Sequence, residues 1–357
     1  MIGKRDCSFD KRLAMDYLKA VGIVLVVIGH YPLSPFNVIT PYMFHMPLFF
    51  FIGGVLFSGK KNTRDIIYSI LKKYVAYIIY TYVAIGVIAT VFKLLFNISI
   101  GAPFSDMGVQ VILSFTNNFS QNPFFVVAWF LLAYALIMLC FHFIITGLSF
   151  LGGKFFISSF ALAICVCIGW LGISVFPNEF KSGGGQVYNL LSQVSVGLMF
   201  YCIGFVLKEY IWSYVNVWVC LGLFSLLYVL EQYGLVSPYT MSQSDYPHGL
   251  ISVLLSTMIC IYLTLSFVVV LSCFVKDRAI AHIGRESKVI MSYHLLSFVV
   301  IDIVVSSFGL LDMSYVNVFN HYAEKWTWPI YISGGVAIPL LGLWIYENLK
   351  LKIRPAK

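Results

Sequence analysis

Residues 15–33 read MDYLKAVGIVLVVIGHYPL, a stretch long and apolar enough to cross a bilayer as one helix. It carries three ionisable side chains, Asp16, Lys19 and His30. On a helix of about 100° per residue, Lys19 and His30 lie within roughly 20° of one another and about 16 Å apart along the axis, and Asp16 falls on the same face. Because ionisable groups in hydrocarbon normally face a wet cavity or a partner, this stripe predicts a cavity wall. The alternatives are a polar contact between helices and an interfacial Lys19.

The composition of the whole chain is that of a membrane protein. Of its 357 residues, 60% are hydrophobic and 11% are charged, and the mean hydropathy is +0.89. These values lie far outside the range of soluble domains. The charged head over residues 1–12 is followed by no small-residue cleavage site, so we expect the first span to be retained. We expect residues 1–357 to form a single integral-membrane domain.

Windows of about twenty apolar residues predict an all-α bundle of ten transmembrane helices. We expect these spans near residues 14–34, 40–57, 74–98, 124–147, 152–176, 189–207, 213–234, 249–274, 288–308 and 328–347. Of the 23 Lys and Arg residues, all but Lys93, Lys181 and Lys325 then fall on one side. The positive-inside rule therefore predicts that both termini are cytoplasmic. The basic residues are spread over short loops, which argues against nucleic acid as a partner.

The eight cysteines give no sign of a metal centre. Seven of them lie inside or at the edges of hydrophobic stretches, and Cys7 lies in the N-terminal head. We therefore expect neither a zinc site nor a disulfide framework.

The three longest loops, at residues 99–123, 235–248 and 309–327, are predicted to lie on the outer side. They mix hydrogen-bonding side chains with aromatic rings. This mixture suits carbohydrate, whose hydroxyls need donors and acceptors and whose faces stack on rings. An ordinary aromatic membrane surface is the alternative interpretation.

The second span contains a histidine close to a proline and a glycine pair. In TPYMFHMPLFFFIGG, Pro47 would free a backbone carbonyl near His45, and Gly53 and Gly54 would permit close helix packing. His45 suits either a packing role or a role in a site.

Two later spans begin with polar or aromatic residues. In IGRESKVIMSYHLL, Arg285 lies at the cytoplasmic edge, and Ser287 and His294 come within about 20° on one face. A structural role is the first interpretation of that pair. Trp129 begins the fourth span, in VVAWFLLAYAL, and is typical of an interfacial anchor.

These motifs together resemble the membrane-bound acyltransferase family 3, whose multi-pass bacterial members O-acetylate surface polysaccharides and related glycans. The resemblance covers essentially the whole chain. Its most specific element is a basic residue and a histidine separated by ten residues, here Lys19 and His30. FHMPLFFFIGG, AWFLLAYAL, FYCIGFVL at residues 200–207 and IGRESKVIMSYH are similar to further family elements in the same order.

The chain departs from the family pattern at two places. ILKKYVAY carries Lys72 and Lys73 where the family often has two arginines followed by a proline. Met291 stands where a tyrosine usually precedes the closing histidine by three residues.

The resemblance implies an O-acyltransferase of the bacterial inner membrane that uses acetyl-CoA as a co-substrate and binds no cofactor. Its acceptor would be a glycan or a lipid-linked oligosaccharide. His30 would take the proton from the attacking hydroxyl or carry the acyl group itself. The donor's phosphates would be held by Lys19, Lys72, Lys73 and Arg285. The supporting residues would be Asp16, which would hold Lys19, and His45, Trp129, Ser287 and His294.

A transporter of a glycan or a lipid-linked precursor is the alternative. Such a carrier would be expected to show paired halves with broken helices, and the sequence shows no such repeat. A purely structural subunit would not explain three aligned ionisable groups on one helix.

Overall fold

The computed structural model describes residues 10–353, with gaps at 34–38, 60, 97, 99–100, 102, 105–118, 120–121 and 214. Over these residues the chain is helical. Within the described ranges, the sole strand-like pairing is one antiparallel bridge between Thr240 and Asp245. The prediction of an all-α fold is therefore confirmed.

Each of the ten predicted ranges overlaps a helix. In chain order these helices are α1 (Lys11–Gly29), α2 (His45–Leu56), α4 (Ala76–Phe96), α6 (Trp129–Gly147), α7 (Lys154–Ser174), α9 (Gln186–Leu207), α10 (Val217–Gln232), α11 (Gly249–Phe274), α13 (Ser287–Ser307) and α14 (Trp328–Ile353). Shorter helical segments between them are η1 (Pro41–Met43), α3 (Thr63–Ile70), η2 (Leu71–Val75), η3 (Pro123–Ala128), η4 (Ser149–Leu151), α8 (Phe176–Glu179), η5 (Phe180–Gly184), η6 (Met241–Gln243), α12 (Arg278–Arg285) and η7 (Met313–Tyr315).

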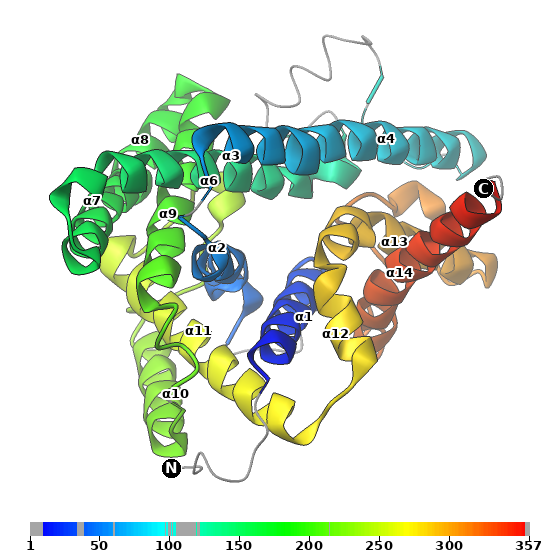
Figure 1. Cartoon of the computed structure of the whole chain (residues 1–357). Coiled ribbons are helices and arrows are strands. Elements are labelled where there is room, and N and C mark those ends of the chain that lie inside the picture. Colours follow the sequence, from blue (N-terminus) through cyan, green and yellow to red (C-terminus); the bar gives the residue numbers. More distant parts are fainter. Residues whose placement is uncertain are drawn as a thin grey trace.

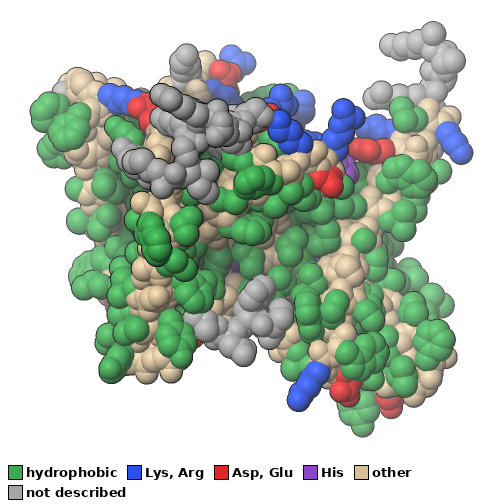
Figure 2. Space-filling model, turned by 90° about the horizontal axis from the view of Figure 1, so that it is seen from below, with side chains coloured by type: hydrophobic (Ala, Val, Ile, Leu, Met, Phe, Trp, Pro, Cys, Tyr) green, Lys and Arg blue, Asp and Glu red, His purple; other side chains and the backbone are tan. Residues whose placement is uncertain are grey.

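Seven helical stretches of the described chain are long and apolar enough to cross a membrane. The other three predicted spans differ from these. α2 and α10 have only 12 and 16 residues, and α1 carries Arg12, Asp16 and Lys19. Figure 2 shows a surface covered by hydrophobic side chains, with Lys and Arg gathered along one edge. The count of ten crossings and the cytoplasmic termini stay predictions.

α1 lies in the middle of the molecule, beside α2 (Figure 1). It packs against α2, α11, α12, α13 and α14. The green helices α7 to α10 lie on one side of α1 and α2, the helices α12 to α14 lie on the other, and α11 passes below α1 in this view. α1 is therefore surrounded by helices from distant parts of the sequence.

Glycines bring α2 and α9 into backbone contact. A Cβ atom on Gly54 would lie 1.8 Å from the carbonyl oxygen of Tyr201, and one on Gly204 would lie 2.1 Å from that of Phe51. Only glycine fits at these two crossings. The predicted close packing at the Gly53–Gly54 pair is therefore confirmed.

The third predicted span begins earlier than expected. α3, η2 and α4 form one continuous helix over residues 63–96. The Asn62 side chain caps its start by accepting the backbone N–H of Asp65 at 2.8 Å. The π-helical turn η2 contains Lys72 and Lys73. These lysines thus lie within a helix rather than at its start.

Most of the described cysteines are free thiols, namely Cys140, Cys165, Cys167, Cys202, Cys220 and Cys260. Cys273 is disulfide-bonded, which the sequence did not lead us to expect.

Candidate functional site

His30 lies at the end of α1 rather than inside a helix over residues 14–34. The helix ends at Gly29, and the backbone N–H of His30 donates to the carbonyls of Val26 and Val27 at 3.3 Å. Pro32 explains this end, because a proline disfavours the helical conformation in the residue that precedes it, Tyr31. The imidazole of His30 therefore stands where α1 stops.

The ring of His30 contacts two other aromatic rings. The centroid of His294 is 5.0 Å away, and that of Tyr42 is 6.4 Å away. His30 is partly exposed, whereas His294 is fully buried. The structure thus brings His294 to the predicted catalytic residue, although the sequence favoured a structural role for it.

One nitrogen of His294 has no partner. Its Nδ1 lies 2.8 Å from the carbonyl oxygen of Met291, and since a carbonyl only accepts, this nitrogen carries the proton. Its Nε2 is then an acceptor, and it is buried without a hydrogen-bond partner among the described residues. Burying such an atom costs free energy, so it points to a group that enters the site.

His45 begins α2 and is held by its Nδ1. This nitrogen donates to the carbonyl of Pro41 at 2.5 Å. Pro47 has no N–H for the carbonyl four residues earlier, that of Met43, which instead accepts the hydroxyl of Thr257 at 2.9 Å. The predicted free carbonyl is therefore present, and α11 supplies its donor.

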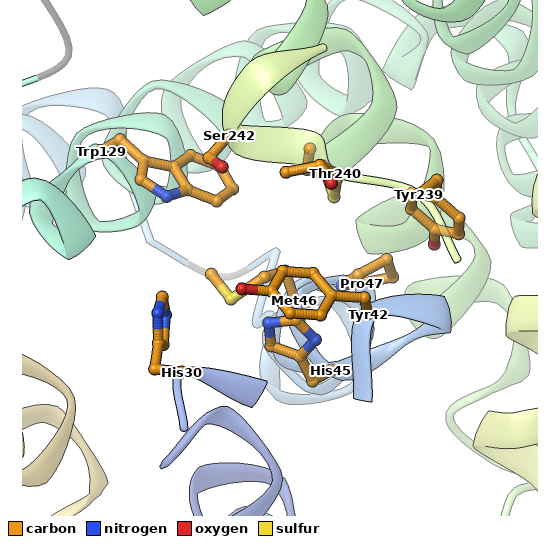
Figure 3. A pocket seen from close by; sticks show the side chains of 10 residues that line it. His30, Tyr42, His45, Met46, Pro47, Trp129, Tyr239, Thr240 and Ser242 are labelled. Carbon is orange, nitrogen blue, oxygen red and sulfur yellow. The ribbon is translucent and has the colours of Figure 1, made fainter. Parts of the chain in front are cut away.

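A small cavity of about 40 Å³ joins these residues. His30, Tyr42, His45 and Trp129 line it together with the segment Tyr239–Ser242. Figure 3 shows His30 below the indole of Trp129, with Tyr42 and His45 beside it and the segment passing across the cavity. The segment belongs to the 235–248 loop, which was predicted to lie on the outer side. Trp129 lines the cavity and is 6% exposed, so it is more than a surface anchor.

Polar side chains of α9 hold this loop in place. The amide groups of Asn189 and Gln193 donate to the carbonyl of Ser242 at 3.1 and 3.2 Å. The hydroxyl of Ser244 donates to the Asn189 Oδ1 at 2.6 Å, which holds Ser244 at a left-handed φ of 49°. Burial raises the pKa of Tyr239, so its phenol stays protonated. α9 therefore fixes the wall of the small cavity that the segment Tyr239–Ser242 forms.

A second cavity, of about 220 Å³, lies beside the cationic residues predicted to hold the donor. Lys19, Arg285, Ser287 and Lys288 line it with the aromatic rings of Phe49, Tyr74, Phe130 and Tyr134. We call it the cationic cavity. Asp16 lies between two of its cations, with carboxylate oxygens 3.5 Å from the Lys19 Nζ and 3.5 Å from an Arg285 guanidinium nitrogen.

The meeting of Asp16 and Arg285 depends on a glycine. A Cβ atom on Gly284 would lie 1.8 Å from the backbone oxygen of Asp16, so the end of α12 rests directly on α1. Arg285 then follows at the rim of the cationic cavity. The sequence expectation that Asp16 holds Lys19 agrees with this geometry, which adds Arg285 as a second partner.

Lys72 and Lys73 line a neighbouring open cavity of about 470 Å³ with Tyr77, Tyr80 and Lys288. Tyr74 and Lys288 line both this cavity and the cationic cavity, so the two adjoin. The Nζ of Lys288 lies 3.8 Å from the ring centroid of Tyr77 and 3.4 Å from the carbonyl of Lys73. The sequence predicted no role in the site for Lys288, although this residue follows Arg285 by three positions.

The cationic cavity and the small cavity are lined by residues that are close in the chain. Met291 lines the cationic cavity, and His294 follows it by three residues on α13. Phe130 lines the cationic cavity, and the preceding residue, Trp129, lines the small one. Among the described residues, no cluster of His, Cys, Asp and Glu could hold a metal ion.

Comparison with known proteins gave one match. Residues 12–347 match the acyltransferase 3 family model, which is described as an acyltransferase domain. No curated protein and no solved structure matches the chain.

Proposed function

The chain belongs to the acyltransferase 3 family, and we propose that it transfers acetyl from acetyl-CoA to a hydroxyl of a surface glycan or its lipid-linked precursor. The family match gives acyl transfer in general and does not favour transport. The observation that carries the rest is the position of His30, which lines a small cavity walled by a polar loop and contacts His294. His294 lies three residues along α13 from Met291, which lines the cationic cavity.

The cationic cavity suits a nucleotide thioester. Coenzyme A carries phosphates, which Lys19, Arg285 and Lys288 can bind by charge-assisted hydrogen bonds. The aromatic rings of the same cavity offer faces on which an adenine can stack. Lys72 and Lys73, in the adjoining cavity, extend the positive surface.

The small cavity suits the reacting edge of an acceptor. Its volume of about 40 Å³ exceeds the roughly 10–15 Å³ that one water needs, so it holds a hydroxyl and its neighbours rather than a whole sugar. Tyr239, Thr240 and Ser242 provide polar groups, and Trp129 provides an indole face. The rest of the glycan would extend outward past the loop.

In direct transfer, His30 takes the proton of the acceptor hydroxyl while the hydroxyl oxygen attacks the thioester carbonyl. The carbon–sulfur bond breaks, and the departing thiolate receives the proton. In a relay, the His30 nitrogen attacks the thioester carbonyl and the carbon–sulfur bond breaks, which releases the thiolate. The acceptor hydroxyl then attacks the acyl carbon, the carbon–nitrogen bond breaks, and the hydroxyl proton passes to the thiolate. In both routes, the Nε2 of His294 can accept a hydrogen bond beside His30, because the two rings are in contact.

The experiment that tests this function compares the host's surface glycan with and without the chain. Mass spectrometry should find an O-acetyl group that disappears on deletion and returns on complementation. Inside-out membrane vesicles given labelled acetyl-CoA should pass the label to the glycan fraction. Identical glycans in both strains, together with unlabelled vesicle glycan, would contradict the proposal.

A further inference from the structure

A cluster near the C-terminal end of α13 contains a buried carboxylate. Asp302 is fully buried in this helix, and three groups donate to it: the His321 Nδ1 at 2.7 Å, the backbone N–H of Tyr322 at 3.1 Å and the Tyr331 hydroxyl at 2.5 Å. An ionisable group inside such a helix is expensive and usually serves a function. Nothing in the proposed chemistry uses it directly.

His321 is the side-chain partner of Asp302. Its Nδ1 faces the carboxylate at 2.7 Å and its Nε2 faces the carbonyl of Val318 at 3.1 Å. Both nitrogens of the buried ring therefore have a hydrogen-bond acceptor beside them. Together with the N–H of Tyr322, these contacts hold the 318–322 segment on α13.

The same cluster reaches the residue that follows His30. The ring of Tyr31 stacks on that of Tyr331 at 4.9 Å between centroids. The Tyr31 hydroxyl donates to the carbonyl of Tyr322 at 3.1 Å and hydrogen-bonds the Thr327 hydroxyl at 2.6 Å. Of these partners, Tyr322 belongs to the 318–322 segment, and Tyr331 on α14 itself donates to Asp302.

This contact matters because α1 ends before His30. A side chain inside a helix is oriented by the helix, but the direction of His30 depends on where the next residue is held. We infer that Asp302, His321 and Tyr331 are positioning residues that set the place of His30 through Tyr31. The inference rests on the proposed function and adds to it an anchoring cluster near the C-terminal end of α13.

Tyr31→Phe and Asp302→Asn test this cluster in the full-length protein. Displacing a reacting group by about 1 Å costs on the order of 10²-fold in rate, so we expect transfer from acetyl-CoA to the host's membrane glycan to fall by about 10-fold or more. The affinity for coenzyme A should stay within about twofold, because the cationic cavity is formed by other contacts. The controls are Tyr315→Phe and Asp312→Asn, whose side chains lie in the loop at residues 309–327 and are exposed.

Thermal unfolding separates positioning from folding. Tyr31→Phe keeps the stacked ring and should unfold near the wild-type temperature while losing activity. If Asp302→Asn does not accumulate in the membrane, Tyr31→Phe alone decides. The inference would be overturned if Tyr31→Phe transferred at the wild-type rate. It would also be overturned if its transfer rate fell only in proportion to the loss of folded protein. Absence of transfer by the wild-type protein would instead contradict the proposed function.

Discussion

The imidazole rings of His30 and His294 lie 5.0 Å apart between centroids and are inclined by 47°. This contact joins the end of α1 to the interior of α13. The carbonyl of Met291 accepts a hydrogen bond from the Nδ1 of His294, and the Nε2 is buried without a partner among the residues that the structure describes. A second imidazole beside the proposed base can therefore accept a proton or fix its orientation.

His294→Ala should lower acyl transfer by about 10- to 10²-fold and leave coenzyme A affinity unchanged, because it removes the acceptor beside His30 without touching the cationic cavity. Steady-state kinetics on purified protein would measure this. The matched control is His282→Ala, whose ring is exposed on α12. Wild-type turnover in His294→Ala would reduce this histidine to a packing residue.

Lys19→Ala should weaken coenzyme A binding by about 10-fold or more, because a charge-assisted hydrogen bond to phosphate is lost. Lys19→Arg should keep part of the affinity, and Lys288→Ala should resemble Lys19→Ala. Calorimetry with coenzyme A would decide. Lys93→Ala, on the predicted outer side, serves as the control. Equal affinity in all four variants would remove both lysines from the donor site.

Gly54→Ala should destabilise the protein by about 1–3 kcal/mol, because the added methyl group would overlap the carbonyl of Tyr201 and push α2 from α9. The midpoint of thermal unfolding in detergent would report the change. Gly222 on α10 has open space around it, so Gly222→Ala should be neutral or slightly stabilising. Equal effects of the two substitutions would contradict the backbone contact as its cause.

The predicted sides of the membrane can be tested by labelling single cysteines in a background without the native ones. Cysteines at the exposed positions Gln243 and Asn320 should react with an impermeant maleimide in intact cells. A cysteine at Asn62 should react only after lysis. The reverse pattern would invert the topology and place the cationic cavity on the outer side.

The positions of the helices could be predicted because hydrophobic periodicity and length are local properties. Each predicted range overlaps a helix, but a helix begins or ends at another residue where a capping side chain or a proline determines its end. The continuous helix begins at Thr63 because Asn62 caps a charged, amphipathic turn that a hydropathy window omits. α1 ends at Gly29 because Pro32 follows closely. A hydropathy window does not detect this effect of a proline.

The contents of the site could be predicted only in part. The stripe of Asp16, Lys19 and His30 is visible within one helix. The contact of His30 with His294 is not, since it depends on how α1 packs against α13. Lys288 was overlooked because one lysine near a helix end is typical of any cytoplasmic edge. The hydrogen bond between Asp302 and His321 joins a helix to a loop, and no local pattern predicts it.

One comparison tests most directly whether His30 performs the transfer. Vesicles containing equal amounts of folded wild-type protein, His30→Ala and the exposed-site control His248→Ala are given labelled acetyl-CoA and the host's membrane glycan. We expect that His30→Ala transfers label at least about 10²-fold more slowly while still binding coenzyme A, and that His248→Ala matches the wild-type protein. Transfer by His30→Ala at the wild-type rate would show that His30 does not perform the transfer.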